Sequence, residues 1–213
     1  VGIMLGYING FLITKIKLPA VIITLGTSSI MRGFLLQLTE GQWVATIPRW
    51  LSKAVNSKAA GIYVSAYIWI IIAVLVYLVF KFTMFGRNIL AMGGNPIGAV
   101  RIGISQEKIY KFVFIISGAL IGIGGTIYVA QLGSAQPVAG VGYEMKLVAA
   151  AILGGNSFSG GKASVTGTCL GVILLGMVNN ALVLAKVPMY WQNFVTGIII
   201  IAAIILSYKK EEI

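Results

Sequence analysis

Apolar runs of about twenty residues recur along this chain, and this pattern limits the possible folds more than any other feature. An α-helix rises about 1.5 Å per residue, so about 20 apolar residues cross the hydrocarbon core of a bilayer. Only 10% of the residues are charged and 58% are hydrophobic, whereas a soluble domain carries about 25% charged residues. A chain of 213 residues with so few charges cannot cover its surface with water-compatible groups. The sequence therefore predicts an all-α, polytopic integral membrane helix bundle.

Six spans are expected after a partial first run. That run, 1–13, has no initiator methionine, basic n-region or signal-peptide cleavage pattern. It has the pattern of the second half of a helix, so we expect an N-terminally incomplete chain. The six further spans are expected at about 18–38, 63–80, 111–131, 138–156, 164–184 and 190–207.

The span 138–156 has an alternative. Its purely apolar core, Leu147 to Leu153, is too short to cross a bilayer, and the span has to include Glu144 and Lys146. A re-entrant hairpin is the other interpretation of this segment. The distribution of charge favours the crossing, because a hairpin would place Lys209 and Lys210 outside and reduce the difference between the two sides.

The basic residues also predict the orientation. If all six spans cross, four cations lie on one side, namely Arg49, Lys53, Lys58 and Lys186. Ten lie on the other side, namely Lys15, Lys17, Lys81, Arg87, Arg101, Lys108, Lys111, Lys162, Lys209 and Lys210. Lys and Arg gather in loops that stay cytoplasmic. We therefore expect a cytoplasmic C-terminal tail.

Several function classes are disfavoured by residues that are absent. The net charge of +11 is not accompanied by a basic stripe with interleaved aromatic residues, so no nucleic-acid partner is expected. The one cysteine, Cys169, cannot form an internal disulfide. There is no histidine, which removes the usual general base and the commonest transition-metal ligand. We expect no catalytic residue, no metal site and no enzyme activity in this chain.

A glycine-rich stretch, ILGGNSFSGGKAS at 152–164, resembles a phosphate-binding loop. Such a loop reads G-x-x-x-x-G-K-[ST], with backbone N–H groups around the phosphates and a hydroxyl on the magnesium. Here Asn156 stands at the first glycine position and Ala163 at the hydroxyl position. The sequence therefore predicts a short cytoplasmic turn and no nucleotide site of its own.

The two longest loops have contrasting patterns. The external one, 39–62, carries apolar residues at near-helical spacing: Trp43, Ile47, Trp50, Leu51, Ala54 and Val55. An interfacial amphipathic helix with tryptophans at headgroup level is one interpretation, and a docking surface for an external partner is the other.

The cytoplasmic loop, 81–110, contains the turn signal Gly93-Gly94-Asn95-Pro96. Pro96 suits the first turn of a short helix from Ile97 to Ile102 that ends at Gly103. A loop of this length is usually functional. We expect its apolar residues Ile97, Val100 and Ile102 to be exposed and to contact a partner.

Polar residues within the spans have two interpretations. Hydroxyls and amides that could pass a polyol are supplied by three groups of residues: Thr24 and Ser28 (with Ser29), Gln131 and Gln136 (with Ser134), and the pair Asn179 and Asn180. They could equally form hydrogen bonds between helices. Arg32 and Glu144 could pair within the membrane, or each could snorkel to the outer interface. We expect glycines to serve close helix packing, namely Gly118, Gly122, Gly124, Gly125, Gly167, Gly171 and Gly176.

Two strings carry a family resemblance: FGRNILAMGGNPIGAVRIGI, and AQLGSAQPVAGVGYEMKLVAAAILGGNSFSGGKASVTGTCLGVILLGMVNNAL. They resemble the permease subunits of bacterial ABC importers for ribose and related sugars, a group that includes permeases for galactosides, xylose and autoinducer 2. The resemblance extends from about Thr24 to the C-terminus. It implies a fold similar to that of vitamin B12-type importers with about ten spans, of which this chain would lack roughly the first three and part of a fourth.

The resemblance also implies a function and partners. Such a permease lies in the bacterial plasma (inner) membrane and passes a monosaccharide. It works with a second permease copy or a paralogue, with an extracytoplasmic sugar-binding protein, and with cytoplasmic ATPase subunits that use ATP and Mg. No cofactor is then expected in this chain. The coupling helix that contacts the ATPase would comprise Gly93, Gly94, Asn95, Pro96, Ile97, Val100, Arg101 and Gly103.

The sequence disfavours two other functions. A self-contained, ion-coupled secondary transporter would need a carboxylate or a broken helix at the midplane, and none of the five acidic residues is expected there. A membrane enzyme acting on lipid would need a catalytic cluster near an interface, and the sequence offers none.

Overall fold

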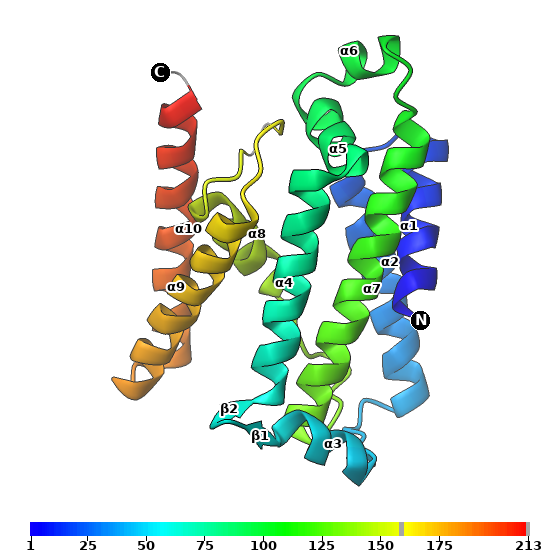
Figure 1. Cartoon of the computed structure of the whole chain (residues 1–213). Helices are drawn as coiled ribbons and strands as arrows, with labels where there is room; N and C mark the ends of the chain where they lie inside the picture. Colours follow the sequence, from blue (N-terminus) through cyan, green and yellow to red (C-terminus); the bar gives the residue numbers. More distant parts are fainter. Residues whose placement is uncertain (158–159, 212–213) are drawn as a thin grey trace. The chain divides into compact units, whose positions relative to one another are not determined.

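The computed structural model describes residues 1–157 and 160–211 of the chain, and most of these residues are helical (Figure 1). The longest helices are α2 (Ala20–Thr39), α4 (Val64–Phe82), α7 (Gln106–Leu132), α9 (Val165–Leu184) and α10 (Met189–Glu211). The shorter elements are α1 (Gly2–Ile16), α3 (Arg49–Asn56), β1 (Lys58–Ala59), β2 (Ile62–Tyr63), α5 (Met84–Gly94), α6 (Pro96–Arg101) and α8 (Tyr143–Leu153). Within the described part of the chain, α2, α4, α7 and α9 are each long and apolar enough to cross a membrane. The prediction of an all-α polytopic membrane protein is confirmed.

The segment of the predicted span 138–156 contains only a short helix. The helix α8 has 11 residues, a length of about 16 Å at the usual rise, which is roughly half of the hydrocarbon thickness. The first part of the predicted span 138–156 is a series of turns, in which Gly140 and Gly142 have φ of 80° and 81°. These values lie in the left-handed region that favours glycine. Crossing and re-entry of this segment both stay predictions.

The chain divides into two compact units, one made of Val1–Ile71 and Gly103–Ala139, the other of Ile72–Ile102 and Gly140–Ile213. In the first unit, α1 packs antiparallel against α7 through a stripe of glycines. Gly2, Gly6 and Gly10 are spaced by four residues and therefore share one face of α1. A Cβ at Gly6 would overlap the carbonyl of Phe114 in α7. Glycine allows the two backbones to approach this closely.

The same unit contains the predicted external helix. This helix, α3, is followed by a small hairpin in which Lys58 pairs with Tyr63 and Ala59 with Ile62. The Ser52 hydroxyl donates to the carbonyl of Ala130 at 3.0 Å, which joins α3 to the end of α7.

The second unit is organised around α8 and α9. Ala149, Ala150 and Leu175 form its buried cluster, and Ile199 of α10 packs against it. Small residues bring α8 and α9 together, because a Cβ at Gly171 would overlap the carbonyl of Ala150. Of the glycines expected at helix contacts, Gly118, Gly122, Gly167 and Gly171 face a neighbouring backbone, whereas an added Cβ would meet nothing within 4 Å at Gly124, Gly125 and Gly176.

Candidate functional site

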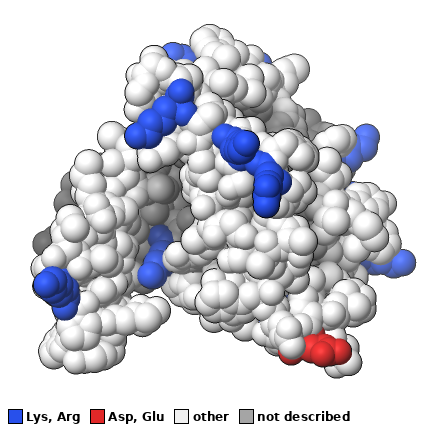
Figure 2. All heavy atoms as spheres, turned by 90° about the horizontal axis from the view of Figure 1, so that it is seen from below, with Lys and Arg blue, Asp and Glu red and all other residues white. Residues whose placement is uncertain are grey.

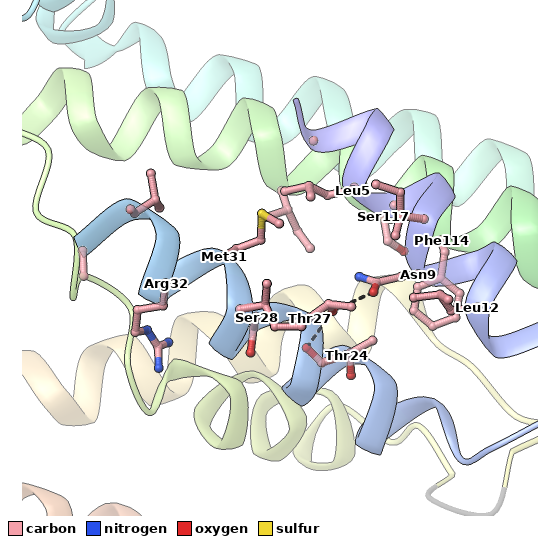
Figure 3. A pocket seen from close by; sticks show the side chains of 18 of the residues that line it. Leu5, Asn9, Leu12, Thr24, Thr27, Ser28, Met31, Arg32, Phe114 and Ser117 are labelled. Atoms are coloured by element: carbon pink, nitrogen blue, oxygen red, sulfur yellow. Dashed lines mark hydrogen bonds between the residues drawn. The ribbon is translucent and has the colours of Figure 1, made fainter. Parts of the chain in front are cut away.

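A groove in the first unit is lined by residues of α1, α2 and α7 and by Pro137 and Ala139 after α7 (Figure 3). Its volume is about 760 Å³ and its lining is mostly apolar. The polar groups along it are Asn9, Thr24, Thr27, Ser28, Arg32 and Ser117. The polar groups are therefore four hydroxyls, one amide and one guanidinium.

Two of the predicted pathway residues, Thr24 and Ser28, line this groove. Each hydroxyl already donates within its own helix, from Thr24 to the carbonyl of Ala20 at 2.9 Å and from Ser28 to that of Leu25 at 2.9 Å. A hydroxyl oxygen that donates once still has lone pairs to accept with. Both side chains can therefore serve a passing solute as acceptors.

A hydrogen bond between Asn9 and Thr27 joins two helices across the groove, and the sequence did not predict it. The Thr27 hydroxyl donates to Asn9 Oδ1 at 2.7 Å, and Figure 3 shows the two side chains pointing toward one another from α2 and α1. Asn9 is an amide in an otherwise apolar run, and such a residue usually faces protein rather than lipid. That signal was available, but the sequence could not supply its partner.

Replacing Thr27 by valine should weaken the contact between α1 and α2. Valine keeps the shape but removes the donor, and hydrogen bonds between membrane helices are worth about 0.6 kcal/mol on average. We expect a loss of about that size in the free energy of unfolding, measured by denaturant titration in detergent. Thr24→Val is the control, because its hydroxyl donates only to carbonyls of its own helix. Equal losses in the two variants would contradict the assignment.

The remaining predicted pathway residues are not gathered at the groove. Gln131 Nε2 donates to Ser65 Oγ at 3.0 Å and ties the end of α7 to the start of α4. Gln136 lies in the turn after α7, where the N–H of Ala139 donates to its carbonyl. Asn179 Nδ2 donates to the carbonyl of Leu175 within α9 at 2.9 Å, and Asn180 is exposed beside it. A solute pathway through these residues stays a prediction.

Arg32 and Glu144 belong to different compact units. Arg32 lines the groove, and in Figure 3 its guanidinium lies apart from the Asn9–Thr27 pair. Glu144 lies in the first turn of α8. Their pairing stays a prediction.

The second candidate region is the junction of α5 and α6, which we call the elbow and define as residues 93–103. Asn95 ends one helix and begins the next: its N–H donates to the carbonyl of Ala91 at 3.0 Å, and its side-chain oxygen accepts from the N–H of Gly98 at 2.8 Å. Pro96 occupies the first turn of α6, where its missing N–H and fixed φ are tolerated. Gly103 follows the helix with φ of 88°. The short helix expected from the sequence is therefore present.

The elbow presents apolar side chains outward. Ile97, Val100 and Ile102 are 69%, 50% and 76% exposed, while Ala99 is buried. Arg101 is exposed beside them. These three large side chains form an apolar surface on a short helix, as expected of a segment that contacts another protein.

Gly160 and Gly161, in the glycine-rich segment before α9, pack against the elbow. A Cβ at Gly160 would overlap the carbonyl of Gly93, and one at Gly161 would lie 2.8 Å from the Cα of Gly94. Gly160 and Gly161 also have φ of 94° and 79°, which disfavours other residues there. The two glycine pairs therefore meet backbone to backbone, a contact that no local sequence pattern predicts.

Asn156, at the position where a phosphate loop has its first glycine, holds this turn together. Its Nδ2 donates to the carbonyl of Ala151 and to Thr168 Oγ1 at 2.6 and 2.7 Å. Its Oδ1 accepts from the N–H of Ser164 at 2.7 Å. These bonds fasten the end of α8 to the start of α9, so the turn has a structural role.

Among the described residues, no group of three or more Cys, Asp or Glu side chains could hold a metal ion. The described part of the chain thus offers a groove with polar groups along it and an elbow with exposed apolar side chains.

Comparison with known proteins gives a consistent result. The family described as "Branched-chain amino acid transport system / permease component" matches residues 1–204. The "Autoinducer 2 import system permease protein LsrC" of Photorhabdus luminescens is 35% identical, over 97% of this chain and 62% of the relative. The proteins of the same name from Salmonella typhimurium (strain LT2) and Escherichia coli (strain K12 / DH10B) are 33% and 34% identical, each over 97% of this chain and over 59% and 60% of their own lengths.

The chain thus spans about three fifths of the length of the curated relatives that it matches. No solved structure matches the chain significantly.

Proposed function

We propose that this chain, which belongs to the branched-chain amino acid transport system / permease component family, forms the translocation pathway of an ATP-binding-cassette importer. The observation that carries the proposal is the similarity to autoinducer 2 import permeases, which extends over 97% of the chain. Its apolar helices place it in a membrane as a multi-pass protein. We place it in the bacterial inner membrane, with its C-terminus in the cytoplasm.

The solute is proposed to be small, polar and sugar-like. The relatives are named for autoinducer 2, and a ribose-like monosaccharide offers similar chemistry. The groove supports such a solute, because its polar lining consists largely of hydroxyls and amides, which exchange hydrogen bonds with a polyol. An extracytoplasmic binding protein would deliver the solute.

The elbow is proposed as the contact with a cytoplasmic ATPase. Ile97, Val100 and Ile102 would enter an apolar recess of that partner, where burial of such side chains stabilises a complex by about 1.5 to 3 kcal/mol each. ATP and Mg would bind to the partner alone. Closure of the ATPase pair would then move the elbow, and the turn packed on Gly93 and Gly94 would carry that movement to the start of α9.

Co-purification tests the contact with an ATPase. The protein is expressed from its native gene together with the neighbouring genes, and it is isolated from membranes. An ATPase subunit should accompany the unaltered protein and should be lost when residues 93–103 are scrambled. Retention of the ATPase by the scrambled protein would refute the proposed contact, and absence of any ATPase from the unaltered complex would refute the importer.

A charge-reversal experiment tests the pairing of Arg32 with Glu144. Arg32→Glu and Glu144→Arg should each reduce the yield of assembled protein in membranes, because each leaves two like charges together. The double variant should restore the yield, measured by gel filtration of the solubilised protein. A double variant no better than the single ones would show that the two side chains reach the interface separately.

A further inference from the structure

The helix α3 has one face fixed on the protein. Val55 is buried, the Ser52 hydroxyl donates to the carbonyl of Ala130 at 3.0 Å, and Asn56 Nδ2 approaches the same carbonyl at 3.4 Å. Val55 and Asn56 lie three and four residues after Ser52, so the three residues share one side of the helix. This attachment determines which side chains α3 presents outward.

The side chains that α3 leaves exposed are cationic and aromatic. Arg49, Trp50, Lys53 and Ala54 are all exposed, and Trp50 is 71% exposed. From residue 41 to residue 63 the sequence holds three cations and no acidic residue. Figure 2 views the end of the molecule at which α3 and the hairpin lie, and both basic and acidic side chains are visible on it.

The helix α3 lies beside the ends of two long apolar helices. Ala130, which α3 contacts, lies two residues before the end of α7, and β2 runs directly into α4 at Val64. Both α7 and α4 are long and apolar enough to cross the membrane. In the hairpin, Lys58 Nζ lies 4.9 Å from the centre of the Tyr63 ring, and tyrosine and tryptophan concentrate at headgroup level.

We infer that the outer face of α3 binds the headgroups of anionic phospholipids. The charge of the face selects this occupant: Arg49 and Lys53 can each approach a phosphate, while the Trp50 ring lies among the headgroups and the upper acyl chains. Each basic side chain near an anionic surface gives roughly a fivefold preference. Because its inner face stays on α7, the helix would bind lipid as part of the folded protein.

Quenching of a single tryptophan by brominated lipids tests the inference. The experiment uses a variant of the protein encoded by the native gene. In this variant every tryptophan except Trp50 is replaced by phenylalanine. It is reconstituted in vesicles in which either phosphatidylglycerol or phosphatidylcholine is brominated, at equal mole fractions. Brominated phosphatidylglycerol should quench Trp50 about twofold more strongly. The excess should disappear at 1 M salt, where the Debye length falls to about 3 Å.

Two variants serve as controls. Arg49→Gln with Lys53→Gln should abolish the excess quenching, because it removes the exposed charges and leaves Ser52, Val55 and Asn56 in place. A protein with Trp69 alone, in α4, should be quenched equally by the two lipids and reports that the protein is folded in the bilayer. Equal quenching of Trp50 by both lipids would overturn the inference. So would protection of Trp50 from both lipids on addition of a binding protein, which would identify the face as a protein contact.

Discussion

Replacing Gly171 by alanine should destabilise the protein by about 1 to 3 kcal/mol, the usual cost of overpacking. The added Cβ would overlap the carbonyl of Ala150 and would lie 3.1 Å from the N–H nitrogen of Gly154. Both neighbours are backbone atoms, so the conflict can be relieved only if α8 and α9 move apart. That movement would expose Ala149, Ala150 and Leu175, the buried cluster of the second unit. The measurement is the free energy of unfolding in detergent, followed by circular dichroism.

Gly176→Ala is the matched control, because it lies in the same helix and an added Cβ there meets nothing within 4 Å. Alanine is favoured over glycine in a helix interior by about 1 kcal/mol. The two substitutions are therefore expected to have opposite signs, with Gly176→Ala neutral or stabilising. A Gly171→Ala variant as stable as Gly176→Ala would show that α8 and α9 do not approach this closely.

Replacing both Ile97 and Val100 by serine should reduce ATP-driven uptake at least about tenfold. Burial of each apolar side chain in a partner is worth about 1.5 kcal/mol or more, and about 1.4 kcal/mol corresponds to a factor of ten in affinity. The variant should fold normally, since both side chains are exposed in the isolated chain. Uptake of solute and the amount of bound ATPase are the two measurements, and both should fall together.

Met84→Ser is the control for this experiment. Met84 is an exposed apolar residue at the start of α5, 73% exposed, and it lies outside the elbow. It should retain both uptake and bound ATPase. If the elbow variant kept its ATPase and its uptake, or if Met84→Ser lost them equally, the elbow would not be the coupling contact.

The sequence predicted well the features that depend on local pattern. The long helices follow from the length of the apolar runs, and the elbow follows from Gly93-Gly94-Asn95-Pro96, in which the capping amide and the proline both act on adjacent residues. The prediction for 138–156 was less complete, because hydropathy gives no direct measure of where glycines turn the backbone. There, Gly140 and Gly142 delay the helix to Tyr143.

Features that depend on distant residues could not be predicted. The glycines of α1 form a visible stripe, but nothing in the sequence identifies Phe114 or Gly118 as their neighbours. The bond between Asn9 and Thr27 and the meeting of Gly93 with Gly160 likewise join segments that only the tertiary fold brings together. The pattern near α3 showed an amphipathic helix, while the contacts to Ala130 determined which face remains exposed.

Uptake of labelled autoinducer 2 into proteoliposomes tests the central claim most directly. The protein from its native gene is reconstituted with its neighbouring ATPase and binding protein, and ATP is enclosed on the side of the elbow. The account predicts uptake that requires ATP, the ATPase and the binding protein together, and that stops when any one of them is omitted. Solute accumulation by the purified chain alone, driven by a proton or sodium gradient without the ATPase, would contradict it.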